Sequence, residues 1–98
     1  VECIKLLFEC IPENISESKR NEILDRAKIG NLLYMKGHIM IYLGKYNGNY
    51  YAIHSLSSTY ENKKKIKVMN TVITDLDLVR KNGTTLKESL LSITFMEF

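Results

Sequence analysis

The stretch GHIMIYLG at residues 37–44 predicts the central strand of this protein. It is rich in β-branched and aromatic residues, as is the run NYYAIHS at residues 49–55. An Asn-Gly pair lies between the two runs, which is a strong signal for a β-hairpin. The two arms carry both histidines of the chain, His38 and His54. We therefore expect an antiparallel hairpin that brings the two imidazoles close together.

The length of the turn decides whether the two histidines share a face of the sheet. A two-residue turn at positions 47 and 48 pairs residue i with residue 95 − i, which places the imidazoles on opposite faces. A three-residue turn over residues 46–48, with Gly48 in the left-handed region, pairs i with 94 − i and sets His54 opposite Met40. His54 and His38 are then diagonal neighbours, about 7–8 Å apart at Cα and within reach of each other. We predict the three-residue turn.

The rest of the chain predicts an α+β fold, an antiparallel sheet with helices packed on one side, in one domain over residues 1–98. The expected elements are a short helix or buried strand (2–10), a helix (16–27), strands (31–35, 39–45, 49–55), a loop (56–65), a strand (66–74), a turn at Asn82-Gly83, a short helix with Leu86 and Leu90 inward, and a terminal strand (93–98). Asn14 with Glu17, and Thr85 with Glu88, have the spacing of capping boxes at the starts of the two later helices.

Composition excludes several classes of protein. The net charge is only +3, and the one basic cluster, at residues 63–67, has no interleaved aromatic or Arg, so we expect a solvated loop and no nucleic-acid partner. No apolar run approaches about 18 residues, so we expect no membrane span, and no signal peptide is visible. Cys3 and Cys10 have neither zinc-site nor Cys-x-x-Cys spacing, and on a helix they would lie about 10 Å apart, too far for a disulfide.

Two histidines on neighbouring strands fit nucleophilic catalysis better than metal binding. A thiol nucleophile needs an imidazole to take its proton, and that imidazole needs a polar partner to set its tautomer. A zinc site would need a third protein ligand, and nothing in the spacing of Asp75 and Asp77 connects them to the histidines. We expect no metal and no cofactor, although simple packing of the two histidines remains the alternative.

At these residues the chain resembles the NlpC-type family of papain-like cell-wall cysteine peptidases. The similarity is carried by GNLLYMKGHIMIYLG at residues 30–44 and by the Ile-His-Ser that ends the hairpin. The tail at residues 72–78 and 86–90 is similar to the C-terminal part of family members that carry SH3-like wall-binding domains upstream. The resemblance covers about residues 15–98, and the His38 block is its most specific part.

The resemblance implies a papain-like cysteine peptidase that hydrolyses peptidoglycan stem peptides, typically after a γ-linked D-glutamyl residue. His38 matches the family's general base, and His54 matches the residue that orients it. The resemblance also implies a secreted or cell-envelope location and a monomer, with wall-binding domains upstream in some members.

The family nucleophile lies in an Asp-Cys-Ser motif at the start of a helix, and Glu2-Cys3-Ile4 is the nearest match here. The N-terminal part therefore corresponds to an abbreviated version of the family's nucleophile helix. Cys3 is the first candidate nucleophile and Cys10 the second, while a nucleophile outside this chain is a third possibility. If Cys3 is the nucleophile, we expect it at a helix N-terminus with its sulfur close to His38. The alternative function is a non-catalytic remnant or partial domain that acts as a wall-peptide-binding or interaction module.

Overall fold

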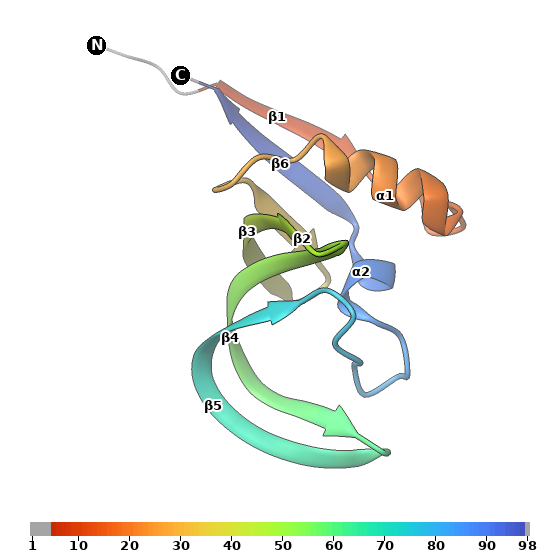
Figure 1. Cartoon of the computed structure of the whole chain (residues 1–98), viewed down its shortest axis with the longest axis vertical. Helices are drawn as coiled ribbons and strands as arrows, with labels where there is room; N and C mark the ends of the chain where they lie inside the picture. The colour runs from red at the N-terminus through yellow and green to blue at the C-terminus, as the bar shows by residue number, and fades with distance from the viewer. Residues whose placement is uncertain (1–4, 98) are drawn as a thin grey trace.

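The computed structural model describes residues 5–97, which form an α+β fold built on one antiparallel sheet (Figure 1). The order of strands across the six-stranded sheet is β1-β6-β2-β3-β4-β5. The elements are β1 (Lys5–Cys10), α1 (Glu17–Asp25), β2 (Leu32–Met35), β3 (His38–Tyr46), β4 (Asn49–Glu61), β5 (Lys64–Asp75), α2 (Leu86–Ser89) and β6 (Ser92–Glu97). Neither helix is long and apolar enough to cross a bilayer, a finding that applies to the described residues.

One face of the sheet forms the core, and both helices pack on that face. Leu33, Met40 and Ala52 point to this side of the central strands and are fully or almost fully buried. Leu24 of α1 and Leu86 of α2 belong to the same buried cluster, which confirms the expected placement of the helices on one side. In Figure 1 the two helices accordingly lie next to each other beside the strands.

The N-terminal segment forms a strand, so the helical alternative over residues 2–10 is wrong for the part that the structure describes. β1 pairs antiparallel with β6 along its whole length, from Lys5 opposite Glu97 to Cys10 opposite Ser92. A segment this short is a marginal helix in water, whereas pairing with β6 satisfies its backbone groups at once. The buried-strand alternative is therefore the one that the tertiary structure selects.

The two helices begin at side-chain caps. α1 starts after Ser16, whose hydroxyl accepts a hydrogen bond from the backbone N–H of Lys19 at 3.2 Å. The prediction that Asn14 caps this helix is therefore wrong, because Ser16 lies directly before the helical residues and satisfies the same orphan N–H groups. The predicted capping box of Thr85 and Glu88 at α2 is confirmed, with both reciprocal hydrogen bonds present.

A buried arginine and a buried lysine join α1 to α2. The guanidinium of Arg20, 5% exposed, donates to the carbonyl oxygens of Lys87 (3.1 Å) and Leu90 (3.3 Å). The Nζ of Lys87 donates in return to Glu17 and Asn21 of α1. These contacts satisfy the carbonyls at the C-terminal end of the short α2 and hold both helices against the same sheet face.

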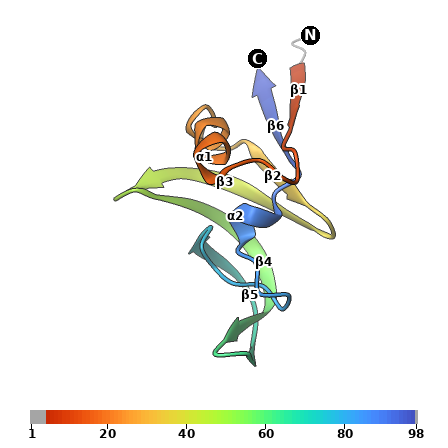
Figure 2. The ribbon, with the colours of Figure 1, turned by 90° about the vertical axis from the view of Figure 1, so that its right-hand side faces the viewer.

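The predicted loop over residues 56–65 is instead the far half of a two-stranded ribbon. β4 continues to Glu61, which pairs with Lys64 across a turn whose two residues, Asn62 and Lys63, have φ of 51° and 64°. Such left-handed pairs form the tight turns that match the twist of a hairpin, and asparagine adopts this conformation readily. The segment was too polar to predict a strand, but a ribbon exposed to solvent needs no apolar face. Figure 2 shows this curved ribbon of β4 and β5 projecting from the end of the sheet opposite β1 and β6.

Candidate active site

The β3–β4 hairpin has the predicted arrangement of its histidines, but its turn and its register differ from the predicted ones. Its turn has two residues, not three: Tyr46 pairs with Asn49, and the left-handed Asn47 and Gly48 lie between them. A β-bulge at Leu43 then shifts the register of β3 by one residue. Near the turn, the numbers of two paired residues sum to 95, and beyond the bulge they sum to 94.

This shift places the two imidazoles on the same face of the sheet. The Nε2 of His38 lies 2.8 Å from the Nδ1 of His54, and the rings meet edge to face with centroids 4.9 Å apart. The predicted proximity of the two rings is therefore confirmed, although the predicted three-residue turn is wrong.

A third side chain extends the contact onto the next strand. The Nε2 of His54 lies 2.8 Å from the Oγ1 of Thr74, which belongs to β5. Thr74 pairs with Ala52 and is thus a diagonal neighbour of His54 on the same face. The result is a hydrogen-bonded chain, His38–His54–Thr74, across three adjacent strands.

The contact of Thr74 with His54 was not predicted from the sequence, because here too a bulge shifts the pairing of the strands. The β4–β5 ribbon has its own irregularity between Leu56 and Ser58, where Met69 of β5 adopts a left-handed φ of 54°. Without that bulge, Thr74 would face away from His54. The Asn62-Lys63 turn sets the pairing of the two strands only as far as this bulge, so the turn by itself would not have identified Thr74.

Burial favours the neutral form of both histidines. His54 is only 4% exposed and His38 is half-buried. The pKa of His54 is lowered by burial and then by the charge of His38, and the pKa of His38 is lowered by burial and then by the charge of Arg80. A neutral imidazole at neutral pH is the state that a general base requires.

Among residues 5–97, the hydrogen bonds leave one imidazole nitrogen of the pair without a partner. Nε2 of His38 and both nitrogens of His54 are engaged within the chain, so the remaining nitrogen is Nδ1 of His38. When His38 donates from Nε2 and His54 donates from Nε2 to Thr74, Nδ1 of His38 carries a lone pair. In this arrangement His54 holds His38 in the tautomer that can accept a proton through Nδ1.

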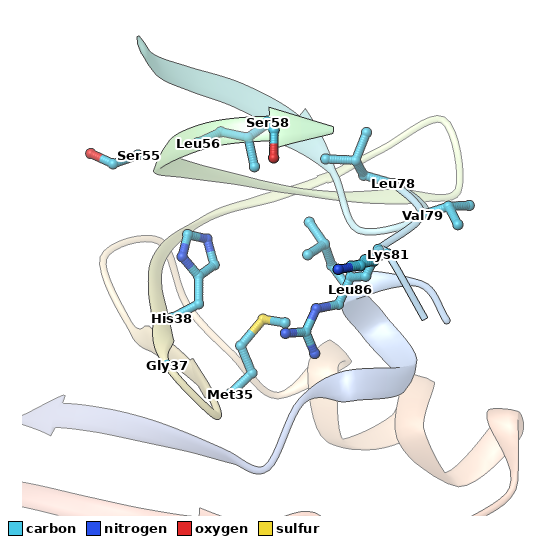
Figure 3. Close-up of a pocket in the computed structure, with 11 residues that line it drawn as sticks. Met35, Gly37, His38, Ser55, Leu56, Ser58, Leu78, Val79, Lys81 and Leu86 are labelled. Atoms are coloured by element: carbon cyan, nitrogen blue, oxygen red, sulfur yellow. The ribbon is translucent and has the colours of Figure 1, made fainter. Parts of the chain in front are cut away.

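His38 lines a cleft of about 260 Å³. Figure 3 shows its ring standing between the β4 segment that carries Leu56 and Ser58 and the side chains of Met35 and Leu86. The lining combines apolar side chains with serine hydroxyls, two cationic side chains and the imidazole of His38, a composition suited to a peptide or similar organic substrate. Chemically, the arrangement can take a proton from a nucleophile that enters this cleft and return it to a leaving group.

Cys10 does not belong to this site. It lies in a row of paired residues, Cys10–Ser92–Tyr34–Ile39, that crosses four strands. Its Cα is therefore three strand spacings, about 14 Å, from that of Ile39. Residues paired in this way share a face, and Ile39 faces away from the side that carries His38. Cys10 is exposed on that other face, and its candidacy as nucleophile is wrong.

Cys3 lies outside the residues that the structure describes. The helix that its predicted role requires is absent from Lys5 onward, where the chain is already the strand β1. Within residues 5–97, then, the structure contains the hydrogen-bonded chain His38–His54–Thr74 and no thiol that reaches it.

The described residues hold no group of three or more His, Cys, Asp or Glu arranged to bind a metal ion. Asp75 instead accepts a hydrogen bond from the backbone N–H of Asp77 at 3.0 Å.

In comparisons with known proteins, no protein-family model and no curated protein matches this chain. The likeness to the NlpC-type peptidases therefore depends on the sequence motifs around His38 and His54.

Proposed function

We propose that this chain is a papain-like, NlpC-type cysteine peptidase domain that acts in the cell envelope on peptidoglycan stem peptides. The observation that carries the proposal is the His38–His54–Thr74 chain, which engages every ring nitrogen of the pair except Nδ1 of His38, a residue that lines a cleft. The motif resemblance supplies the substrate class. A thiol peptidase needs this arrangement of base and orienting groups, and a packed pair of histidines does not need a free acceptor beside a cleft.

In the proposed mechanism, Nδ1 of His38 takes the proton of a cysteine thiol, and the thiolate attacks the carbonyl carbon of the scissile peptide bond. The tetrahedral intermediate collapses when the His38 imidazolium returns its proton to the leaving amine. His38 next activates a water molecule, which hydrolyses the acyl-enzyme and regenerates the thiol. Throughout, His54 accepts the Nε2 hydrogen of His38 and itself stays neutral, which fits its burial.

We assign the nucleophile to Cys3, because Glu2-Cys3 resembles the family motif and Cys10 is on the wrong face of the sheet. A second candidate function is a non-catalytic wall-peptide-binding module. It is favoured by the strand β1, which replaces the expected nucleophile helix in the described residues.

Alkylation by iodoacetamide near neutral pH distinguishes the two functions. We expect Cys3 to be labelled faster than Cys10, and we expect His38→Ala to slow the labelling of Cys3 alone. Mass spectrometry of the labelled peptides measures both rates in one sample. Cys3→Ser should abolish muropeptide cleavage, whereas the matched variant Cys10→Ser should leave it unchanged.

Equal labelling rates for Cys3 and Cys10, together with no cleavage of muropeptides, would contradict the peptidase assignment. The same protein would then be tested for muropeptide binding, which the non-catalytic function requires.

A further inference from the structure

Two cationic side chains line the cleft that contains His38. Arg80 is half-buried and Lys81 is exposed, and both border the cleft from the segment between β5 and α2. Among the described residues, neither takes part in any of the ion pairs, all of which lie elsewhere on the protein. The cleft therefore presents positive charge that is not paired with any carboxylate in the described part of the chain.

The segment that carries these cations is held in a defined shape. The N–H of Arg80 donates to the carbonyl of Thr84 at 2.7 Å, and the N–H of Gly83 donates to the carbonyl of Arg80 at 3.0 Å. An isolated β-bridge joins Val79 to Thr85, the residue that caps α2. The loop is thus anchored at its base to α2, so the backbone of Arg80 is positioned before any ligand arrives.

The positive charge extends beyond the cleft. A second hollow, of about 640 Å³, lies between this loop and the turn of the β4–β5 ribbon, and it too is lined by Arg80 and Lys81. Lys63 of the ribbon turn contributes a third cation there and Glu61 the one acidic group. Arg80 and Lys81 therefore stand between two adjoining hollows whose lining is cationic overall.

The charge of Arg80 reaches the proposed reacting centre. It contributes to the lowered pKa of His38, after the larger effect of burial. A ligand group bound by Arg80 would therefore lie close to a bond that His38 can act on.

We propose that Arg80, assisted by Lys81, is a specificity-determining residue that binds a free carboxylate of the peptide substrate beside the scissile bond. The guanidinium is suited to this task because its paired N–H groups match the two oxygens of a carboxylate. The inference depends on the proposed function for the substrate class: a glutamyl residue linked through its γ-carboxyl group retains a free α-carboxylate. Arg80 would select this acid over the corresponding amide.

The test is a double-mutant cycle between protein and ligand, measured as binding so that no catalysis is needed. The ligands are the synthetic tripeptide L-Ala-γ-D-Glu-L-Lys and the same peptide with the glutamyl α-carboxylate converted to the amide. Titration calorimetry with the full chain, carrying Cys3→Ser to prevent turnover, gives both dissociation constants. Because the acid gains a charge-assisted hydrogen bond from Arg80, we expect it to bind about tenfold or more tightly than the amide.

In Arg80→Gln we expect the ratio of the two dissociation constants to fall to about one, and in Arg80→Lys to an intermediate value, because lysine keeps the charge and loses the fork. Lys28→Gln removes the same charge from an exposed position away from the cleft, and it should leave the ratio unchanged. Thermal unfolding of each variant checks that it is folded.

The inference would be overturned if the parent protein bound the acid and the amide with equal affinity, or bound neither. A ratio that persists in Arg80→Gln would also overturn it. These outcomes are separable from failure of the peptidase assignment. Acid-selective binding without any cleavage by the protein that retains Cys3 would refute only the catalysis. Cleavage without preference for the acid would refute only the role of Arg80.

Discussion

Thr74→Val tests the hydrogen-bonded chain at its far end. Valine has nearly the shape of threonine and favours strands, so the substitution removes the acceptor of the His54 Nε2–H and little else. His54 is 4% exposed, so water cannot easily replace the lost partner. The Nε2 of His54 is then unsatisfied in either tautomer, and a buried donor or acceptor left unsatisfied costs about 1–3 kcal/mol. For a domain of this length, each kcal/mol lowers Tm by roughly 5 °C, which gives an expected drop of about 5–15 °C.

The same strand offers a matched control. Thr71 is exposed on β5 and makes only a long contact, 3.5 Å, with Ser55. Thr71→Val should change the free energy of unfolding by less than about 0.5 kcal/mol. Comparing the two variants by thermal unfolding removes the general effect of placing valine on this strand.

The hydrogen-bonded chain also predicts a spectroscopic effect of Thr74→Val. Without an acceptor at Nε2, His54 gains by moving its proton to Nδ1, which then donates to Nε2 of His38. His38 is thereby left with its proton on Nδ1, the tautomer that cannot act as a base through that atom. The ¹⁵N chemical shifts of both imidazoles report these tautomers. Unchanged shifts, together with a loss of stability no larger than that of Thr71→Val, would refute the hydrogen-bonded chain.

Two further predictions concern stability. Burial lowers the pKa of His38 and His54 below the ordinary value of 6.5, so the unfolded chain binds protons at these residues before the folded protein does as the pH falls. The free energy of unfolding should therefore decrease as the pH falls through 6.5 and below. Denaturant titrations at pH 7.5 and 5.5 measure this dependence, which His38→Gln should flatten. Arg20→Met removes a buried side-chain donor from two carbonyls near the end of α2, of which that of Lys87 keeps the N–H of Leu90, and should cost about 2–3 kcal/mol. Arg26→Met, which breaks a surface ion pair with Glu9, should cost less than about 1 kcal/mol. Equal losses in the two arginine variants would show that the buried contacts of Arg20 contribute nothing beyond a surface pair.

The sequence by itself determined the α+β class, the hairpin and the presence of both histidines on it. These features are local: the Asn-Gly pair, the β-branched runs and the Thr85–Glu88 capping box each act within a few residues. The helices on one side of the sheet followed from the order of the elements. The capping box was predictable because its hydrogen bonds join residues three apart in the chain.

The tertiary structure alone decided which side chains meet. Because side chains alternate along a strand, the one-residue bulge at Leu43 reverses the face of every residue beyond it. Whether a bulge forms depends on how the bent strand packs against its neighbours as well as on its own backbone: next to the bulge, Gly44 has a φ of 122°, which L side chains rarely adopt. No local pattern encodes that packing. The same holds for β1, which is a strand because β6, more than eighty residues later in the chain, lies beside it.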